Sequence, residues 1–323
     1  MRIAFTVCNR HQFRHALTLG ESLLSHNPEF KFIVGWTDSA PLPELPPWLT
    51  LIRINELDRI DWQGMALRYY DFEFVAACKP FFARYILSKY QSCTELLYIS
   101  PSTWVLGAMD SILNSEVFFQ LTPHRLGPIT ESGRLDDKAI LNMGMYHAGC
   151  WALHPDGQEK QLFDWWCERT AERAHFDLCQ GMCLDQLWMN YLPALYSGIQ
   201  PIRNPGWHYG LHAVAGHELS LDATMNFQVD QQTLVTVDFT GIEGYHPVWT
   251  DYADLIHEQK NWPSLLAAYR ERLDAQKVPS FDPASTPYGK VPLIKNYRKQ
   301  RKRVVGLLKD MIHRIETYDL THN

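Results

Sequence analysis

The sequence lacks the cysteine patterns of secreted and zinc-bound domains. Its seven cysteines include no pair spaced as Cys-x-x-Cys, and their number is odd. An odd count without a secretory leader is typical of reduced thiols, because disulfide frameworks use cysteines in pairs. The apolar run within residues 1–11 is too short for a signal peptide. These absences favour a cytoplasmic protein.

Further absences exclude other classes of protein. No stretch of about 18 uncharged apolar residues occurs, so the sequence predicts no membrane-spanning helix. A basic excess is also missing. The formal net charge of −6 argues against nucleic acid as the main partner, because backbone phosphates require a basic surface. No Gly-x-Gly-x-x-Gly fingerprint follows the first apolar segment, which argues against a dinucleotide site there.

What the sequence does contain is an alternation of short apolar strands and amphipathic helices. Residues 2–8 and 30–36 have strand composition, and the helical segment 13–28 lies between them. This β-α-β opening predicts a parallel sheet with a right-handed crossover, the start of a Rossmann-like half. We expect further strands at 50–54, 95–99, 116–123 and 144–155, and helices at 71–90 (kinked or restarted at Pro80), 159–176, 184–192 and 261–276.

The last part of the chain differs in composition from the rest. Residues 279–292 carry four prolines and have linker composition. We therefore divide the chain into a body, 1–278, and a tail, 279–323. The tail ends in a predicted amphipathic helix whose apolar stripe comprises Val304, Leu308, Met311 and Ile315.

The tail is also strongly basic. Residues 290–303 hold seven Lys or Arg and no acid. Such a run is either a solvated helix face or, through residues 290–317, a peripheral contact with anionic lipid headgroups. The sequence leaves both interpretations open.

Polar side chains stand where a sheet of this type binds ligands. Residues 8–11, Cys-Asn-Arg-His, follow the first strand, where a doubly wound sheet binds a nucleotide, although an ordinary polar loop is equally expected. Lys79 and Arg84 lie five residues apart on an otherwise apolar helix. They either extend to the surface or contact an anionic ligand, phosphate above all.

Two more groups of residues lie near a predicted helix at 184–192. Asp185 either caps that helix or, with Gln186, presents a carboxylate and an amide to a reacting sugar. His175, Cys179 and Cys183 are spaced four apart and would share a helical face as metal ligands. A glycine interrupts that helix and a fourth ligand is not evident, so packing is favoured over zinc.

Polar and aromatic residues recur toward the end of the body. Residues 204–212, NPGWHYGLH, gather Trp207, His208, Tyr209 and His212 around glycine turns, and form either an aromatic binding loop or a rigid structural loop. Asp238 follows a strand run, so it is either a polar group at a sheet end or a turn residue.

Taken in order, these segments resemble bacterial GT-A-fold glycosyltransferases related to glycosyltransferase family 8. The resemblance covers about residues 2–245, and the order of its pieces is more specific than any one motif. It implies an α/β fold with a GT-A (Rossmann-like) mixed sheet flanked by helices, followed by the basic amphipathic C-terminal helix. The similar pieces are CNRHQFRHALTLGESLLSHNP, FEFVAACKPFFARYIL, LLYISPSTWVLG, FFQLTPHRLGP, ILNMGMYHAGCWALHP, GMCLDQLWMN, IRNPGWHYGLH and VTVDFTG.

The resemblance also implies a nucleotide-sugar site at the C-terminal edges of the sheet strands. Thr6, Cys8 and Asn9 would line the nucleoside pocket, and Lys79 would reach the ribose or the phosphates. His147 and Gly149 would border the sugar and the acceptor. The further candidates for the donor site are Arg84, Ser100, Ser102, His124, His208 and Asp238.

The catalytic pair implied by the resemblance is Asp185 and Gln186, beside the anomeric carbon. In such retaining enzymes the group at the Gln186 position is debated as a nucleophile or as a dipole that steadies an oxocarbenium-like state. The implied reaction is therefore a retaining sugar transfer.

The departures from the family fall at its metal site. The family's D-x-D here reads Ser100-Pro101-Ser102, and the His of its H-F-x-G reads Asp238; these positions hold manganese or magnesium in the family. A hard divalent ion prefers charged oxygen ligands, so we expect weak or no metal binding and no cofactor. A leaving diphosphate must still be neutralised, which cationic side chains can do. The candidates are Lys79, Arg10, His124, Arg125, His208 and His212.

The sequence therefore predicts a metal-independent glycosyltransferase. It would move a sugar from a nucleotide-sugar donor to a glycan, lipid-linked or small-molecule acceptor, in the cytoplasm or at the inner face of the membrane. A non-catalytic nucleotide-sugar or glycan-binding relative is the alternative, and a structural protein held at a membrane by its tail is a third. Retention of Lys79, Asp185 and Gln186 favours the enzyme, because a mere scaffold has no use for them.

Overall fold

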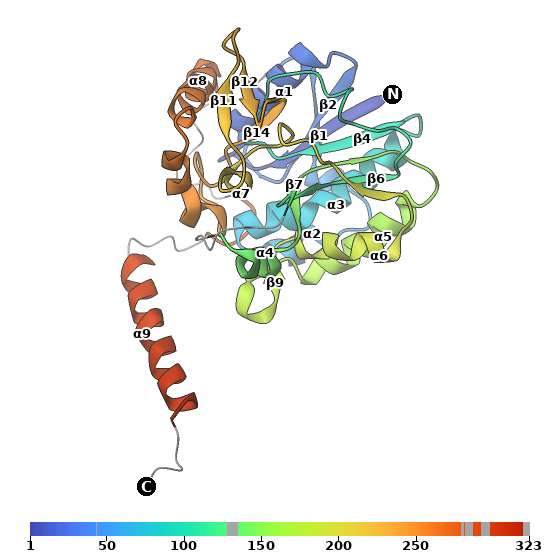
Figure 1. Ribbon diagram of the computed structural model, residues 1–323. Coiled ribbons are helices and arrows are strands. Elements are labelled where there is room, and N and C mark those ends of the chain that lie inside the picture. Colours follow the sequence, from blue (N-terminus) through green and yellow to red (C-terminus); the bar gives the residue numbers. More distant parts are fainter. Residues whose placement is uncertain (43, 128–134, 279–280, 282–286, 292–297, 319–323) are drawn as a thin grey trace. The chain divides into compact units, whose positions relative to one another are not determined.

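Figure 1 shows the computed structural model of the chain, which describes residues 1–42, 44–127, 135–278, 281, 287–291 and 298–318. The chain divides into two compact units, Met1–Lys290 and Val291–Asn323, and each is described by itself. Much of the linker expected at 279–292 and of the basic run expected at 290–303 lies outside the described residues and side chains.

A seven-stranded mixed sheet forms the centre of the first unit, in the order β10-β6-β7-β4-β1-β2-β3 (Figure 1). β1 pairs in parallel with β2 and β4, whereas β7 runs antiparallel to both of its neighbours, β4 and β6. The predicted α/β fold with a mixed sheet is confirmed. The strands are β1 (Arg2–Cys8), β2 (Phe30–Trp36), β3 (Leu49–Arg53), β4 (Glu95–Ile99), β6 (Phe119–Pro123), β7 (Tyr146–Leu153) and β10 (Ile199–Pro201).

The longer helices of this unit lie where the sequence predicts them. α3 runs without a break through Pro80, so the helix does not restart there. α5 ends before residue 176, because Phe176–Asp177 form the short strand β8, which pairs with β9 (Met182–Cys183). These helices are α1 (Phe13–His26), α3 (Asp71–Lys89), α5 (Glu159–Glu172) and α8 (Trp262–Ala275).

Helices cover both faces of the sheet, because β1 alternates its side chains between two buried cores. Ile3, Phe5 and Val7 pack in one core with side chains of α3 and α5. Ala4 and Cys8 pack in the other core with side chains of α1. Both faces of β1 are therefore buried, which explains its almost uninterrupted apolar sequence.

The helix predicted at 184–192 is wrong in kind. The chain forms a 3-10 helix, η3 (Leu187–Tyr191), followed by a short α-helix, α6 (Leu192–Leu195). Leu184 has a left-handed backbone, with φ of 55°, which an α-helix of L residues cannot continue. The turn at Leu184 separates β9 from η3 and holds Asp185 and Gln186 between them.

Short elements complete the first unit. A third core joins α8 to the segments around Trp249 and Phe239. The short elements are η1 (Ile54–Glu56), α2 (Trp62–Arg68), β5 (Thr103–Val105), α4 (Asp137–Met143), η2 (Leu178–Gln180), α7 (Leu211–Val214), β11 (Leu219–Leu221), β12 (Phe227–Val229), β13 (Gln232–Thr233), β14 (Thr236–Asp238) and η4 (Trp249–Glu258).

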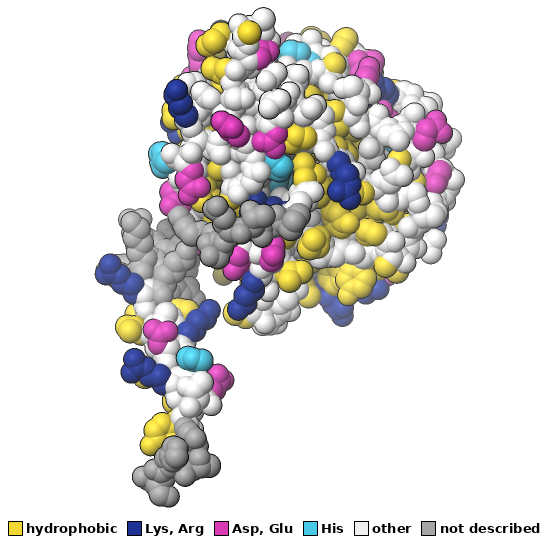
Figure 2. Space-filling model, viewed as in Figure 1, with side chains coloured by type: hydrophobic (Ala, Val, Ile, Leu, Met, Phe, Trp, Pro, Cys, Tyr) yellow, Lys and Arg dark blue, Asp and Glu magenta, His cyan; other side chains and the backbone are white. Residues whose placement is uncertain are grey.

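The second unit contains the helix α9 (Arg298–Glu316), which confirms the predicted C-terminal helix. Figure 2 shows apolar and charged side chains side by side on it. Its apolar stripe is exposed at Val304, Leu308, Met311 and Ile315. None of the described helices combines the length and apolar character needed to span a bilayer.

Candidate active site

The register of the sheet brings three strand ends to one edge. β4 ends at Ile99, which pairs with Cys150 of β7, so the turn at Ser100–Ser102 lies beside the start of β7. β6 ends at Pro123, which pairs with Tyr146. Ser100, His124 and His147 therefore gather at this edge although they are far apart in the sequence.

A small second sheet adds Asp238 and His208 to the same edge. β14 pairs antiparallel with β5, which sets Asp238 opposite Thr103 and next to Ser102. An isolated bridge between Tyr209 and Val237 then brings His208 beside Asp238. Asp238 therefore belongs to a polar cluster, and it is also the last residue of β14.

Ser100, Ser102, Thr240 and Asp238 form a closed hydrogen-bonded group. Ser102 Oγ and Thr240 Oγ1 donate to Asp238 Oδ1 at 3.1 and 2.7 Å. Ser100 Oγ lies 3.2 Å from Thr240 Oγ1. Because these hydroxyls satisfy one another, and only one of the four residues can carry charge, they do not fit the hard divalent ion of the family's D-x-D site. The sequence did not predict a role for Thr240, although this residue lies two positions from Asp238.

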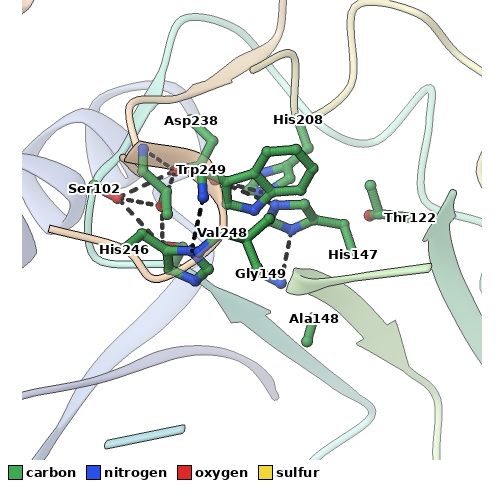
Figure 3. Close-up of polar contacts among 12 residues, drawn as sticks. Ser102, Thr122, His147, Ala148, Gly149, His208, Asp238, His246, Val248 and Trp249 are labelled. Carbon is green, nitrogen blue, oxygen red and sulfur yellow. Dashed lines mark hydrogen bonds and ion pairs between the residues drawn. The ribbon is translucent and has the colours of Figure 1, made fainter. Parts of the chain in front are cut away.

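Four histidines cluster together, and two of them, His147 and His208, face this carboxylate. The ring of His147 lies 4.9 Å from that of His208, 4.6 Å from that of His212 and 5.1 Å from that of His124. Trp249 stacks on His147, with centroids 5.8 Å apart (Figure 3). The sequence indicated each of the four histidines as a separate candidate. It predicted neither that they lie together nor that Trp249 joins them, because the residues come from four separate segments.

Burial keeps these imidazoles neutral. It lowers the pKa of His124 to about 4. It also holds the pKa of His147 and His212 well below the ordinary value, helped by the neighbouring imidazoles. Burial lowers the pKa of His208 as well, against the carboxylate of Asp238, which raises it. Desolvation therefore disfavours the charged form of His124, His208 and His212, and their part in neutralising a leaving diphosphate stays a prediction.

A buried ion pair lies next to the histidines. Lys79 Nζ is 3.0 Å from Asp185 Oδ2 and 3.1 Å from Oδ1, and Asp185 is 1% exposed. Burial raises the pKa of Asp185, and Lys79 opposes this by stabilising the carboxylate. The capping role considered for Asp185 is wrong, because η3 begins after Gln186 and has no side-chain cap.

Gln186 ties this ion pair to the start of β7. Its Oε1 accepts a hydrogen bond from Ala148 N (3.2 Å), and its Nε2 donates to Met143 O (2.8 Å). Lys79 Nζ also donates to Ala148 O (3.4 Å). Ala148 lies between His147 and Gly149, so the predicted catalytic pair and the histidine cluster share one segment of backbone.

The other cationic candidates have partners of their own. Arg10 is buried against Asp38, with Nε 2.7 Å from Oδ2. Arg84 pairs with Asp164 on α5 at 3.2 Å, which matches the surface interpretation, and Arg125 donates to Leu135 O (2.9 Å).

The residues predicted to line a nucleoside pocket lie in and just after the end of β1. Thr6 is buried, with an Oγ1 that has no hydrogen-bond partner among the described residues. Asn9 Oδ1 accepts from His11 N (3.0 Å), an Asx turn that shapes the loop. Burial raises the pKa of the Cys8 thiol, which disfavours the reactive thiolate.

The zinc set considered at His175, Cys179 and Cys183 does not share a helical face. The three residues follow α5, lie in η2 and lie in β9, respectively. His175 Nδ1 instead faces Glu73 Oε2 at 3.5 Å. The zinc interpretation required one helix over these three residues, and residues 175–183 do not form a continuous helix.

Comparisons with known proteins leave the family open. No family model matches the chain. The chain is 23% identical over 223 residues to the uncharacterized protein YfnF of Bacillus subtilis (strain 168), covering 65% of this chain and 71% of YfnF.

Two solved structures show a distant likeness. A glycosyltransferase involved in glycosylation of the major capsid of PBCV-1 has a TM-score of 0.42 at 8% identity, over 79% of this chain and 98% of its own. The galactosyltransferase LgtC, in complex with donor and acceptor sugar analogs, has a TM-score of 0.45 at 12% identity, over 83% of this chain and 100% of its own. Likenesses this weak carry no argument about function.

Proposed function

We propose that this chain is a glycosyltransferase that moves a sugar from a nucleotide-sugar donor to an acceptor. The observation that carries the proposal is the meeting, at one sheet edge, of Lys79, Asp185 and Gln186 with the turn at Ser100–Ser102 and with Asp238. These are the positions that the family resemblance assigns to catalysis and to the donor diphosphate. They come from separate parts of the chain, and the fold brings them together.

In this proposal Asp185 and Gln186 act on the anomeric carbon with retention of configuration. A buried carboxylate paired with Lys79 can stabilise a developing oxocarbenium charge, because it acts in a site of low dielectric. The Gln186 amide is held at both ends by backbone groups, which suits a fixed dipole better than a nucleophile.

Transfer would proceed without Mg²⁺ or Mn²⁺. The hydroxyls of Ser100 and Ser102 lack the charge that such ions require, and they are engaged with Thr240 and Asp238. Lys79 is then the cation of the site best placed for the leaving diphosphate. Its ammonium group would have to interact with both the diphosphate and Asp185.

The acceptor would be a glycan, a lipid-linked sugar or a small molecule, and the reaction would take place in the cytoplasm or at the inner face of the membrane. The basic run and apolar stripe of residues 290–317 would supply a peripheral contact with anionic lipid. Sedimentation with anionic vesicles tests the contact, which should weaken as salt is raised.

The alternative is a non-catalytic nucleotide-sugar or glycan-binding protein. One observation favours it: Asp185 and Gln186 are both engaged by other groups of the protein, Lys79 and the backbone of Ala148. A binding protein would keep the pocket and release no nucleotide from the donor.

Donor hydrolysis by the Asp185→Asn variant distinguishes a glycosyltransferase from a non-catalytic binding protein. We expect the variant to bind donor but to lose turnover by at least about a hundredfold, since the charge of a catalytic carboxylate is removed. Asp164→Asn, at the half-buried pair with Arg84, is the matched control and should keep full turnover. Equal turnover in Asp185→Asn and wild type would refute the catalytic assignment, and no turnover in wild type with any donor would support the binding protein.

A further inference from the structure

We propose that His147, His208 and Asp238 form a binding site for a divalent transition-metal ion of the zinc class. One ligand atom from each of these buried residues lies within 4.8 Å of the others. His147 Nε2 and His208 Nε2 are 3.7 and 3.5 Å from Asp238 Oδ2, close to the spacing of ligand atoms around one small ion. Figure 3 shows the two imidazoles beside the carboxylate.

His208 supplies an independent indication of a missing ligand. The residue is fully buried, and neither of its ring nitrogens has a hydrogen-bond partner among the described residues. Most buried side-chain polar atoms in folded proteins have a partner, and within the described part of the chain His208 has both of its ring nitrogens unpartnered beside a carboxylate oxygen, an arrangement that suits a bound ion. A metal ion bound at Nε2 would satisfy the nitrogen that faces Asp238.

Asp238 is oriented as a metal ligand is. The hydrogen bonds from Ser102 Oγ, Thr240 N and Thr240 Oγ1 all end on Oδ1. Oδ2 is left to face the two imidazoles. Carboxylates that bind metals are commonly held in this way by outer hydrogen bonds, which fix the direction of the free oxygen.

His147 must change its tautomer to bind. Its Nδ1 accepts a hydrogen bond from Gly149 N (2.9 Å), so the neutral ring carries its proton on Nε2, toward Asp238. To bind an ion at Nε2, the neutral ring would have to lose its single proton from Nε2 to solvent and take one up at Nδ1, so that it remains neutral. The Gly149 amide would then have to turn away, a single hydrogen bond lost against new metal bonds.

The chemistry of the ligands selects the kind of ion. Imidazole suits zinc, cobalt, iron and copper, whereas magnesium and manganese prefer carboxylates and other oxygens. Two histidines and one carboxylate leave a coordination position open, as in catalytic zinc sites. A zinc-class ion at this site is consistent with the expected exclusion of Mg²⁺ and Mn²⁺, but it replaces the expectation of a site without any metal. The proposed metal site does not rest on the proposed transferase activity.

Metal titration of the full chain tests this site directly. Protein stripped with EDTA is titrated by calorimetry with Zn²⁺ and with Mg²⁺, and Co²⁺ is added separately to record its visible absorption. We expect one Zn²⁺ per chain, no binding of Mg²⁺, and the intense Co²⁺ bands of a four- or five-coordinate site with nitrogen ligands. Zn²⁺ binding no stronger than that of Mg²⁺, or a Co²⁺ spectrum unchanged from the aqueous ion, would overturn the proposal.

Variants locate the ion. His208→Ala should weaken Zn²⁺ binding at least tenfold and abolish the Co²⁺ bands, whereas His257→Ala, at an exposed histidine of η4, should bind as the wild type does. If His208→Ala fails to fold by circular dichroism, Asp238→Asn, which keeps the shape of the side chain, takes its place. Undiminished Zn²⁺ binding in a folded His208 or Asp238 variant would place the ion elsewhere and defeat the proposal. Donor binding is measured separately, so its loss cannot be mistaken for failure of the metal site.

Discussion

Asp185 is a buried carboxylate whose charge depends on one lysine. Lys79 contacts both of its oxygens, and its ammonium group lies 5.1 Å from the centre of the Tyr98 ring. Removing one partner of a buried pair leaves the other charge unpaired in a low dielectric. Such a pair therefore specifies an arrangement more than it adds stability.

Lys79→Met should be strongly destabilising. We expect the free energy of unfolding to fall by about 3–5 kcal/mol, because Asp185 stays buried without its partner. Lys160→Met is the control: it removes an exposed i,i+4 pair with Asp164, which contributes at most about 1 kcal/mol. Urea unfolding of both variants measures the difference, and equal losses would show that Asp185 does not depend on Lys79.

Gly149 is a second residue on which the site depends. A Cβ atom at this position would lie 2.6 Å from His147 Nδ1 and 3.0 Å from His208 Nε2. The same residue donates to His147 and accepts a hydrogen bond from Ser100 N (2.6 Å). Only glycine lets the backbone approach both imidazoles this closely.

Gly149→Ala should therefore displace both histidines, at a cost of about 1–3 kcal/mol in unfolding free energy from overpacking. Gly107→Ala is the matched control, since a Cβ there meets only ordinary contacts at 3.8 Å or more. Thermal unfolding and the imidazole proton resonances of His147 and His208 report the two effects. Unchanged resonances in Gly149→Ala would show that the neighbouring backbone absorbs the methyl group.

At the scale of elements, the contact between α1 and α8 carries a titratable group. His15 Nδ1 lies 2.7 Å from Tyr269 Oη. Burial lowers the pKa of His15 to about 4, with Glu243 and Asp238 opposing this and Arg14 adding to it. The unfolded chain thus takes up a proton at higher pH than the folded chain does. Stability from this group is full above pH 6.5, falls as pH drops from about 6.5 to 4, and is constant below that.

His15→Gln should flatten the acid side of the stability curve. The loss of unfolding free energy between pH 7 and pH 4 should shrink by on the order of 2 kcal/mol relative to wild type, after allowance for partial exposure. His257→Gln, at an exposed histidine, should leave the curve unchanged. Denaturant unfolding at a series of pH values gives the comparison, and parallel curves for wild type and His15→Gln would contradict it.

The elements also show which parts of the fold and of the candidate site the sequence could predict. Strands β1, β2 and β4 and helices α1 and α3 follow from hydrophobic period and length, because both faces of β1 are buried and α3 is a long apolar helix. The 3-10 helix η3 was missed, since its form depends on the left-handed Leu184. The histidine cluster was missed as well: its residues lie in separate segments, and only strand register brings them together.

At the scale of the whole molecule, the first unit extends to Lys290. Lys290 N donates to Tyr69 O (2.8 Å), and Asp71 N donates to Lys290 O (2.9 Å). The ring of Tyr288 packs 4.9 Å from that of Trp62. These contacts lie beyond residue 278, the boundary expected from composition.

A chain that ends at Lys290 should therefore unfold at the same temperature as the full chain. A chain that ends at residue 278 should lose on the order of 2 kcal/mol, because it gives up the half-buried ring contact of Tyr288 with Trp62 and the backbone hydrogen bonds of Lys290. Calorimetric unfolding of the two chains decides where the unit ends. Equal stability of both would place the end at residue 278.

The measurement that tests the central claim most directly is calorimetric titration of the full chain with UDP-, GDP-, dTDP- and CMP-sugars, first in EDTA and then with manganese. The account predicts that at least one donor binds in EDTA and that manganese does not strengthen the binding. Binding that appears only with manganese would contradict transfer without that ion, and no binding under either condition would contradict the glycosyltransferase itself.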